Sequence, residues 1–290
     1  HANATPLMGG VAIVLPFVVA VSYLAFDSDY RPFLQVLVLT TAVLFVLGLV
    51  DDRSHIRPLL RLTLSVLICF VSILVVPALN ITFFNFSFLG APIFLSGGWS
   101  VIFTLLCLVG LQNAVNMADG KNGLVIGLSL VWVIFLTLYA PSHLLPLLWV
   151  LAVCLSVTLL FNLRGRLFLG DSGSYAVSIS IGLLVIYVYQ VKFEVLSADI
   201  VALWFLVPIL DCLRLMAMRT VRGSSPFTPD RNHLHHILFR LMRWHVALAT
   251  YLLLVAVPSL LAYVMPQSTL LWAVMSVLAY FFFVVIELRV

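Results

Sequence analysis

Charged residues make up only 9% of the 290 residues, whereas 63% are hydrophobic and the mean hydropathy is +1.20. Because soluble domains carry about 25% charged residues, this composition excludes a soluble globular protein and indicates an integral membrane protein. The formal net charge of +4 comes from short loops between apolar runs, so it reports membrane orientation, and we expect no nucleic-acid partner.

Ten apolar runs follow one another along the chain, and their length matches the ~17–25 residues that cross a hydrocarbon core. We therefore predict an all-α, polytopic transmembrane bundle of ten helices in a single domain over residues 1–290. Pro58 and Pro146 fall in first turns, where proline is tolerated, and Pro208 predicts a kink. The uncharged segment Pro77–Gly98 is predicted to form a short hairpin or to lie in the membrane interface. The predicted helices span 8–25, 33–50, 59–76, 99–115, 124–140, 145–161, 174–190, 199–218, 246–264 and 270–287.

Positive charge is confined to one side of these helices. Of the 15 Lys and Arg residues, all but Arg31 and Lys192 fall in loops on the same side, and the positive-inside rule assigns that side to the cytoplasm. Both ends of this chain then lie in the cytoplasm. The acidic and histidine-rich segments described next fall on that side too, so a site that they form faces the cytoplasm.

The second apolar run ends in Asp51 and Asp52. Two carboxylates at a helix C-terminus oppose the macrodipole, which favours cations there, so they need a positive partner. Arg53 and Arg57 are the nearest candidates for a structural ion pair. The alternative is a Mg²⁺ or phosphate-handling site, since Mg²⁺ is usually held by one or two carboxylates plus substrate phosphates.

A polar segment, NAVNMADGKNGL at 113–124, interrupts two long apolar runs. Asn113, Asn116 and Asp119 recur every third residue, so a helix places them on one side. Gly120 then breaks the helix and allows the backbone to approach a ligand closely. The segment is either a polar loop that caps a helix or part of an active site.

Two further acids lie near the same membrane boundary. Asp171 is flanked by glycine in RGRLFLGDSGS at 164–174, ahead of a predicted helix. It either caps that helix or belongs to a phosphate–metal site, because free N–H groups at a helix N-terminus attract anions. Asp211 lies within an apolar run, and an ionisable group at membrane depth suggests function; Arg214, three residues on, is the alternative structural partner.

The longest cytoplasmic loop, 220–245, contains a histidine cluster. Thr228 as N-cap and Pro229 at the first helical position predict a helix start. His233 and His236 then share a helix face. The predicted helix carries Asp230, Arg231, His233, His235 and His236.

Four patches rich in acids or histidines therefore fall on one side of the membrane, at 51–52, 119–122, 171 and 230–236. Random placement would scatter such loops over both faces. A metal site among basic and histidine residues, at the boundary of an apolar bundle, suits a reaction that joins a cytosolic anion to a lipid.

These motifs, in this order, resemble the polyprenyl-phosphate N-acetylhexosamine-1-phosphate transferases, a family that includes phospho-MurNAc-pentapeptide translocase. The resemblance covers nearly the whole chain. The histidine motif with its PDR lead is the most specific, and it resembles the branch that uses UDP-GlcNAc or related UDP-HexNAc donors. The matching segments are TPLMGG at 5–10, LGLVDD at 47–52, NAVNMADGKNGL at 113–124, FLGDSGS at 168–174, PILD at 208–211 and SPFTPDRNHLHH at 225–236.

The resemblance implies that a polyprenyl-phosphate oxygen attacks the β-phosphorus of a UDP-sugar, giving polyprenyl-diphosphate-sugar and UMP. It implies a UDP-HexNAc donor such as UDP-GlcNAc, undecaprenyl phosphate as acceptor, and Mg²⁺ as cofactor, with Mn²⁺ as an alternative. The expected location is the bacterial inner membrane, at the first membrane step of a cell-envelope glycan such as cell wall or lipopolysaccharide O-antigen. The identity of the HexNAc, the polymer and a homodimer stay open.

The resemblance also implies roles for individual residues. Metal binding falls to Asp51, Asp52 and Asp171, and uracil stacking to Phe168. The expected catalytic set is Asp51, Asp52, Asp119, Asp171, His233, His235 and His236; the expected substrate contacts are Asn113, Asn116, Asn122, Phe168, Asp230 and Arg231. A phosphate monoester has a second pKa near ~6, so we expect catalysis by positioning and charge neutralisation through Mg²⁺, arginine and histidine. Proton removal by Asp51 or Asp52 is a further hypothesis.

Two departures from the family pattern and several rival functions remain. Asn122 stands where the family usually has an acid, and an additional helix is expected ahead of His1. A non-catalytic homologue is therefore an alternative. A transporter would need polar groups near mid-membrane and repeat symmetry, a di-iron oxygenase would need several histidine boxes, and a zinc peptidase would need an HExxH helix.

Overall fold

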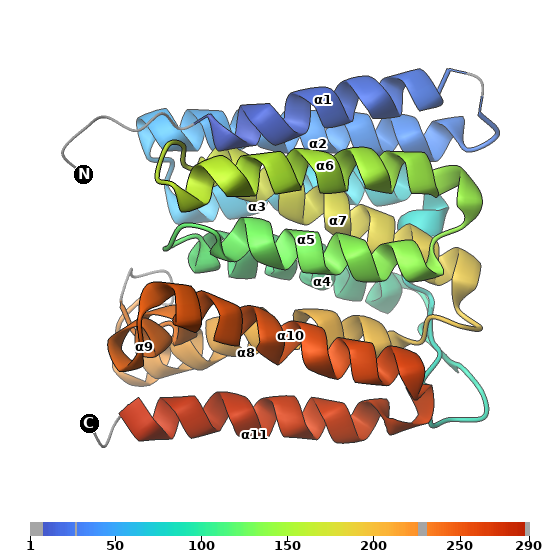
Figure 1. Ribbon diagram of the computed structural model, residues 1–290. Coiled ribbons are helices and arrows are strands. Elements are labelled where there is room, and N and C mark those ends of the chain that lie inside the picture. The colour runs from blue at the N-terminus through green and yellow to red at the C-terminus, as the bar shows by residue number, and fades with distance from the viewer. Residues whose placement is uncertain (1–7, 27, 226–230, 288–290) are drawn as a thin grey trace.

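The computed structural model describes residues 8–26, 28–225 and 231–287, and these residues form eleven α-helices and one two-stranded hairpin. Figure 1 shows the long helices side by side, with α1 beginning and α11 ending at the end of the bundle where the short α9 lies. The helices are α1 (Gly9–Leu24), α2 (Arg31–Ser54), α3 (Pro58–Val75), α4 (Gly98–Ala118), α5 (Leu124–Tyr139), α6 (Leu145–Leu163), α7 (Gly170–Lys192), α8 (Ala198–Val221), α9 (Leu234–Leu241), α10 (Trp244–Val264) and α11 (Thr269–Glu287).

The ten predicted membrane helices correspond to α1–α8, α10 and α11. Within the described ranges, eight helices are long and apolar enough to cross a membrane, and α1 and α5 are shorter apolar helices. The chain is therefore an integral membrane protein with an all-α fold, as predicted. Pro58 and Pro146 lie in the first turns of α3 and α6, also as predicted.

Most helices extend beyond the predicted limits, and three of these extensions reach acidic segments of the predicted site. α2 continues to Ser54 and α4 to Ala118, while α7 already begins at Gly170. Hydropathy marks only the apolar part of a membrane helix, whereas the backbone hydrogen-bond ladder continues into polar sequence. Asp51 and Asp52 therefore lie in the last turns of α2, and Asp171 lies in the first turn of α7.

Helix α7 forms the centre of the bundle. Every residue from Ser172 to Tyr189 is buried, and α7 packs along α2 and against α1, α4 and α5. Small side chains let membrane helices approach closely, and hydroxyls can bond across the interface, as Thr41 of α2 does with Ser180 of α7 at 2.8 Å. This central helix carries Asp171 at the end of the bundle where α9 lies.

Gly48 lets α2 approach the start of α7. A Cβ added at Gly48 would lie 2.4 Å from the Cα of Ser172, closer than real atoms come. Asp52 lies one turn after Gly48 on the same face of α2. The close approach at Gly48 therefore brings the Asp52 carboxylate to the first turn of α7.

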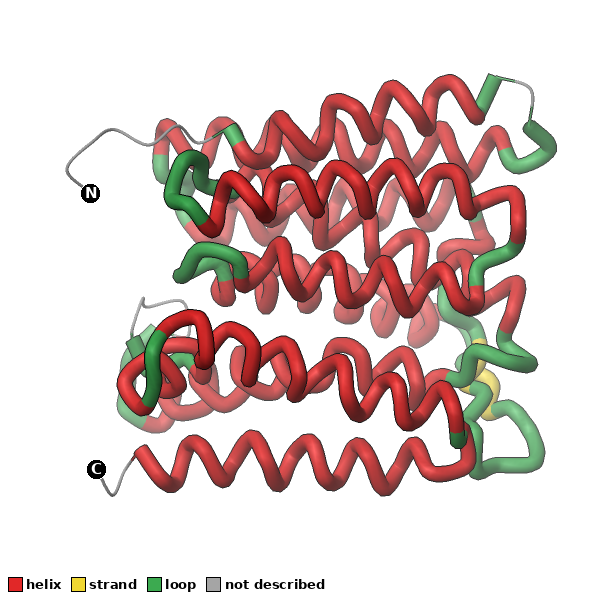
Figure 2. Tube along the Cα trace, in the orientation of Figure 1, coloured by secondary structure: helices red, strands yellow, loops and turns green. Residues whose placement is uncertain are grey.

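The opposite end of the bundle carries a small hairpin, shown in yellow in Figure 2. Strand β1 (Phe83–Phe84) pairs antiparallel with β2 (Ile93–Phe94), so the segment Pro77–Gly98 contains the hairpin that was one of its two predicted arrangements. The Asn85 backbone N–H donates to the hydroxyl of Tyr189 on α7 at 2.8 Å. The hairpin therefore covers the far end of the central helix, away from the polar loops.

We predict that Gly48→Ala destabilises the protein by about 1–3 kcal/mol, the usual cost of an overpacked core. The added methyl group would push α2 away from Ser172. The midpoint of thermal unfolding in detergent should fall. Gly110→Ala is the matched control, because a Cβ there would meet nothing within 4 Å. Equal midpoints for the two variants would contradict the close contact.

Candidate active site

Asp52 caps a helix other than its own. Its carboxylate accepts hydrogen bonds from the backbone N–H groups of Asp171 (2.8 Å) and Ser172 (3.1 Å) in the first turn of α7. Those N–H groups have no acceptor within α7, and the positive end of the α7 dipole favours a carboxylate. Gly170 makes room, because a Cβ there would lie 2.9 Å from Asp52 Oδ2 and its φ of +75° is left-handed. The α7 terminus thus supplies the positive partner that Asp52 needs.

Asp51 is buried and held by three donors. Its Oδ2 accepts from the Tyr175 hydroxyl (2.7 Å) and from Arg61 Nη1 (3.0 Å), and its Oδ1 accepts a backbone N–H at 2.8 Å. The cationic partner is Arg61, rather than the nearer Arg53 or Arg57 suggested by the sequence. Both of those arginines are exposed, whereas α3 folds back along α2 and brings its first turns to Asp51.

Asn162, at the end of α6, joins two loops: the loop between α4 and α5, and the loop between α6 and α7. Its Oδ1 accepts from the Gly123 N–H (2.5 Å), and its Nδ2 donates to the Leu167 carbonyl (2.8 Å). Helix α1 holds the second loop from the other side, because the Gly9 N–H donates to the carbonyl of Phe168 at 2.9 Å. These bonds fix the backbone on both sides of the Phe168 ring.

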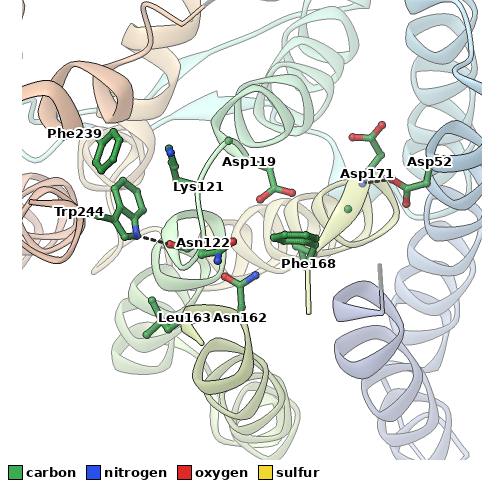
Figure 3. A pocket seen from close by; sticks show the side chains of 13 residues that line it. Asp52, Asp119, Lys121, Asn122, Asn162, Leu163, Phe168, Asp171, Phe239 and Trp244 are labelled. Atoms are coloured by element: carbon green, nitrogen blue, oxygen red, sulfur yellow. Dashed lines mark hydrogen bonds between the residues drawn. The ribbon is translucent and has the colours of Figure 1, made fainter. Parts of the chain in front are cut away.

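The two loops and the ends of α2, α7, α9 and α10 enclose a pocket of about 640 Å³. Figure 3 shows Asp119, Asn122 and Phe168 gathered at the middle of this hollow, with Phe239 and Trp244 on one side and Asp52 and Asp171 on the other. The pocket is lined by Asp52, Asp119, Gly120, Lys121, Asn122, Asn162, Leu163, Phe168, Leu169, Gly170, Asp171, Phe239 and Trp244.

The pocket carries an excess of negative charge around Asp119. Burial raises the pKa of Asp119 to about 7, and the neighbouring carboxylates of Asp171 and Asp52 act in the same direction. Among the residues that line the pocket, only Lys121 is positively charged, and its Nζ lies 4.3 Å from the centroid of the Phe239 ring. The site therefore favours a ligand that brings both a cation for the acids and an anion for the lysine.

The lining acids fit a Mg²⁺ ion held together with substrate phosphates. Mg²⁺ prefers oxygen ligands and usually takes one or two carboxylates from the protein, and the mutual repulsion at Asp119 is the sign of carboxylates that lack a counter-charge. In the described part of the chain, no group of three or more His, Cys, Asp or Glu residues could hold a metal by itself. Asp52, Asp119 and Asp171 are the acids of the lining, and the two oxygens of Asp52 each already accept one backbone hydrogen bond, so Asp119 and Asp171 are the first ligands to expect.

The histidine segment differs from its predicted form. Helix α9 begins at Leu234, so the described Arg231 and His233 precede it, and the prediction that they lie within the helix is wrong. The expected cap at Thr228, with Pro229 and Asp230 after it, lies outside the described residues. His233 takes the position just before α9 because its ring bonds to α8 and holds the backbone in an extended conformation there.

His235 and His236 lie beside the pocket as neutral rings. Burial lowers the pKa of His235 to about 3, and the neighbouring His236 and His233 act in the same direction. Burial and the nearby cationic groups also lower the pKa of His236. The His235 ring lies against Gly120, where an added Cβ would be 2.6 Å from its Nε2. These rings therefore offer hydrogen bonds at neutral pH rather than the positive charge expected of them.

The side-chain amides of Asn113 and Asn116 form hydrogen bonds with α4 and α7 and do not line the pocket. Asn113 Nδ2 donates to the Val109 carbonyl of its own helix at 2.7 Å, and Asn116 Oδ1 accepts from the Ser174 hydroxyl on α7 at 2.8 Å. Arg231 is exposed and does not line the pocket either. The structure thus gathers Asp52, Asp119, Asn122, Phe168 and Asp171, and it places Asp51, Asn113, Asn116, Arg231 and the three histidines outside the lining.

Several lining residues were missed from the sequence. Lys121 was hidden within the polar segment, and Phe239 and Trp244 look like ordinary apolar residues of a loop and a helix start. Trp244 Nε1 donates to the Asn122 carbonyl at 3.2 Å, which fixes the turn that carries Lys121. Asn162 gave a usable signal, because a lone amide at the end of an apolar run needs a specific partner.

Comparison with known proteins agrees with these features. Residues 34–189 match the family described as Glycosyl transferase family 4, a range that includes the acid pair, Asp119 and Asp171. An undecaprenyl-phosphate alpha-N-acetylglucosaminyl 1-phosphate transferase of Salmonella typhi is 29% identical over 83% of this chain, and the protein of that name from Escherichia coli (strain K12) is 26% identical over 83%. A decaprenyl-phosphate N-acetylglucosaminephosphotransferase of Mycobacterium tuberculosis is 30% identical over 87% of this chain and 70% of its own length. The chain spans 66% of the length of the first two relatives.

The lowered pKa of His235 predicts a loss of stability in acid. An unfolded histidine takes up a proton below its ordinary pKa of 6.5, whereas the folded ring stays neutral down to about 3. The unfolded state therefore binds more protons, and stability falls as pH drops below 6.5, by about 1.4 kcal/mol per pH unit.

Thermal unfolding in detergent at about pH 7.5 and about pH 5, on either side of the ordinary histidine pKa, tests this expectation. His235→Phe removes the titrating group and keeps a flat ring, so its unfolding midpoint should change less between the two pH values than that of the wild type. The same change in both proteins would show that His235 does not resist protonation.

Proposed function

Because the chain belongs to glycosyl transferase family 4, we propose that it transfers N-acetylglucosamine 1-phosphate from UDP-GlcNAc to undecaprenyl phosphate and releases UMP. The observation that carries this proposal is the pocket in which Asp119, Asp171 and Lys121 meet aromatic rings at one end of a membrane bundle. The three compared relatives bear the names of polyprenyl-phosphate transferases of this sugar phosphate. A pocket with acids, one lysine and aromatic rings suits a sugar nucleotide that arrives with a divalent cation.

The proposed location is the bacterial inner membrane, with the pocket facing the cytoplasm. The support is the distribution of Lys and Arg, because among those in the described part of the chain all but Arg31 and Lys192 fall on the side of the pocket loops. A sugar nucleotide is charged and cytosolic, while a polyprenyl phosphate keeps its chain in the bilayer. A pocket at this boundary lets the two phosphates meet.

In the proposed reaction an oxygen of undecaprenyl phosphate forms a bond to the β-phosphorus of the donor. The bond between that phosphorus and the oxygen that bridges to the α-phosphate breaks, and the bridging oxygen leaves with UMP. The acceptor phosphate is mostly dianionic at neutral pH, because its second pKa is near ~6. It needs no strong base. Proton removal by Asp51 or Asp52 stays a prediction; the Asp51 carboxylate already accepts three hydrogen bonds and the Asp52 carboxylate two.

The residues of the pocket divide the remaining tasks. Asp119 and Asp171 would hold Mg²⁺, which would neutralise phosphate charge when bound. Lys121 would attract the donor phosphates, and Phe168 would stack on the uracil ring. Asn122 lies where the resembled family has an acid, so the turn after Asp119 carries one negative charge less and keeps a hydrogen-bonding amide.

A UMP-release assay tests the proposal. The purified full-length protein should release UMP from UDP-GlcNAc only with undecaprenyl phosphate and Mg²⁺ present, and Asp171→Asn should lower kcat by at least about 100-fold, because a charged ligand at the reacting phosphates is lost. Glu194→Gln, an exposed acid at the other end of the bundle, should leave the rate unchanged. No release from a panel of UDP-HexNAc donors, in a folded sample, would overturn the proposed function.

Lys121 gives a second test of the pocket. Lys121→Met should raise KM for UDP-GlcNAc by about tenfold and alter kcat less, because the charge-assisted bond to the donor is lost while the reacting groups stay in place. Donor titrations in the UMP assay measure both constants. Lys192→Met at the opposite end is the matched control. A donor KM equal to that of the wild type would place the donor phosphates elsewhere.

A further inference from the structure

A second buried charge cluster lies behind the pocket, around Asp211 of α8. This carboxylate is only 4% exposed. It accepts hydrogen bonds from His233 Nδ1 (2.8 Å), from Arg214 Nη2 (3.0 Å) and from the Tyr280 hydroxyl of α11 (2.9 Å). The Arg214 ion pair expected from the sequence is present, but it is one contact of four, and the other three join α8 to the histidine segment and to α11.

The fourth contact caps α9. Oδ1 of Asp211 accepts the backbone N–H of Leu234, the first residue of α9, at 3.0 Å. Arg214 Nη2 also donates to the Asn232 carbonyl at 2.5 Å. The residue before α9 makes no side-chain cap, so the carboxylate of α8 satisfies an N–H that would otherwise lack an acceptor.

The bond to Asp211 also determines the tautomer of a neutral His233 ring. An ionised carboxylate only accepts hydrogen bonds, so the Nδ1 of a neutral His233 must carry the proton that it donates to Asp211. The Nε2 atom is then left as an acceptor. Which nitrogen of His233 carries the proton therefore depends on the negative charge of Asp211, and not only on the shape of the Asp211 side chain.

A series of contacts connects Asp211, through His233, to the wall of the pocket. The His233 ring stacks on His235 with centroids 5.5 Å apart and planes 12° from parallel, and His235 lies against Gly120 of the pocket lining. Further along α9, Phe239 lines the pocket beneath the Lys121 ammonium. A shift of the start of α9 would therefore displace two parts of the wall.

We propose that Asp211 is a positioning residue of the donor pocket, which acts through His233 and the first turn of α9. It touches neither the pocket nor the reacting atoms. It sets the place of α9 and the tautomer of one histidine, and both then determine how well the sugar nucleotide binds. The inference rests on the function proposed above for the same pocket.

Asp211→Asn tests the inference with little change in shape. The new amide can still accept the Leu234 N–H, but its NH₂ group faces His233 Nδ1 and forces the other tautomer. Asp199→Asn is the matched control, since Asp199 is also a hydrogen-bonded acid of α8, but at the far end, where it accepts from Ser87. Thermal midpoints of both variants establish that they fold.

The first readout needs no activity. Hydrogen exchange of residues 231–241, followed by mass spectrometry in detergent, should be faster in Asp211→Asn than in the wild type or Asp199→Asn, because the cap of α9 is weakened. Unchanged exchange over this range would overturn the proposal, whatever the enzyme does.

The second readout is kinetic. Asp211→Asn should raise KM for UDP-GlcNAc by about tenfold to hundredfold, the loss expected for a charge-assisted hydrogen bond, with a smaller change in kcat. His233→Ala combined with Asp211→Asn should cost little more than either change alone, because both act through one ring. Wild-type kinetics in Asp211→Asn, or additive losses in the double variant, would refute the inference. If the wild type and Asp199→Asn also release no UMP, the proposed function fails, and the assignment to a donor pocket fails with it.

Discussion

The hydrogen bonds from the first turn of α7 to the carboxylate of Asp52 determine how this site is built. A helix that starts among other membrane helices exposes N–H groups which neither lipid nor its own backbone can satisfy. Here the acceptor belongs to α2, and Asp171 and Ser172 are its donors. One interaction therefore satisfies the start of the central helix, balances a carboxylate at the end of α2, and holds Asp171 at the rim of the pocket.

A buried carboxylate needs hydrogen-bond donors or a counter-charge, and the acids of the bundle meet this requirement in different ways. Asp51, Asp52 and Asp211 each accept hydrogen bonds from two or more groups, which is what burial of a charged group requires. Asp119 lies among other carboxylates, and burial and their repulsion raise its pKa to about 7. The three acids that are satisfied within the protein serve to place helices, and Asp119 and Asp171, whose pKa values burial and neighbouring carboxylates raise, are the acids of the proposed cation and phosphate site.

Hydropathy and charge were sufficient to predict the membrane helices and the side on which the polar segments gather, and they left the hairpin as one of two alternatives. They could not predict which helices touch, because lipid-facing and helix-facing residues are equally apolar. The partner of Asp52 is α7, 119 residues later in the chain. Proximity in sequence favoured Arg53 for Asp51, yet the chain reversal between α2 and α3 brings Arg61 instead.

The structure of the histidine segment could not be predicted from the local sequence either. The pattern of residues indicated a helix that carries all three histidines and uses them to neutralise charge, whereas His233 precedes α9 and bonds to a buried acid, and His235 is enclosed beside Gly120. Both outcomes depend on contacts with α8 and with the turn after α4, and no local pattern encodes those contacts. Asp119 and Asp171 were found because their residue types already suited phosphate and metal chemistry, whereas Asn122 and Phe168 were found only through the family resemblance. Phe239 acquires its place through the packing of α9, and Lys121 through the turn after α4 that Trp244 of α10 holds.

The proposed function requires that the pocket between the Asp119 turn and the start of α7 binds the sugar nucleotide. The most direct measurement is a cryo-electron microscopy structure of the full-length protein with UDP-GlcNAc and Mg²⁺. We expect density for the nucleotide in this pocket, with its phosphates near Asp119 and Lys121 and its uracil against Phe168. Nucleotide density in another place, with this pocket empty, would contradict this expectation.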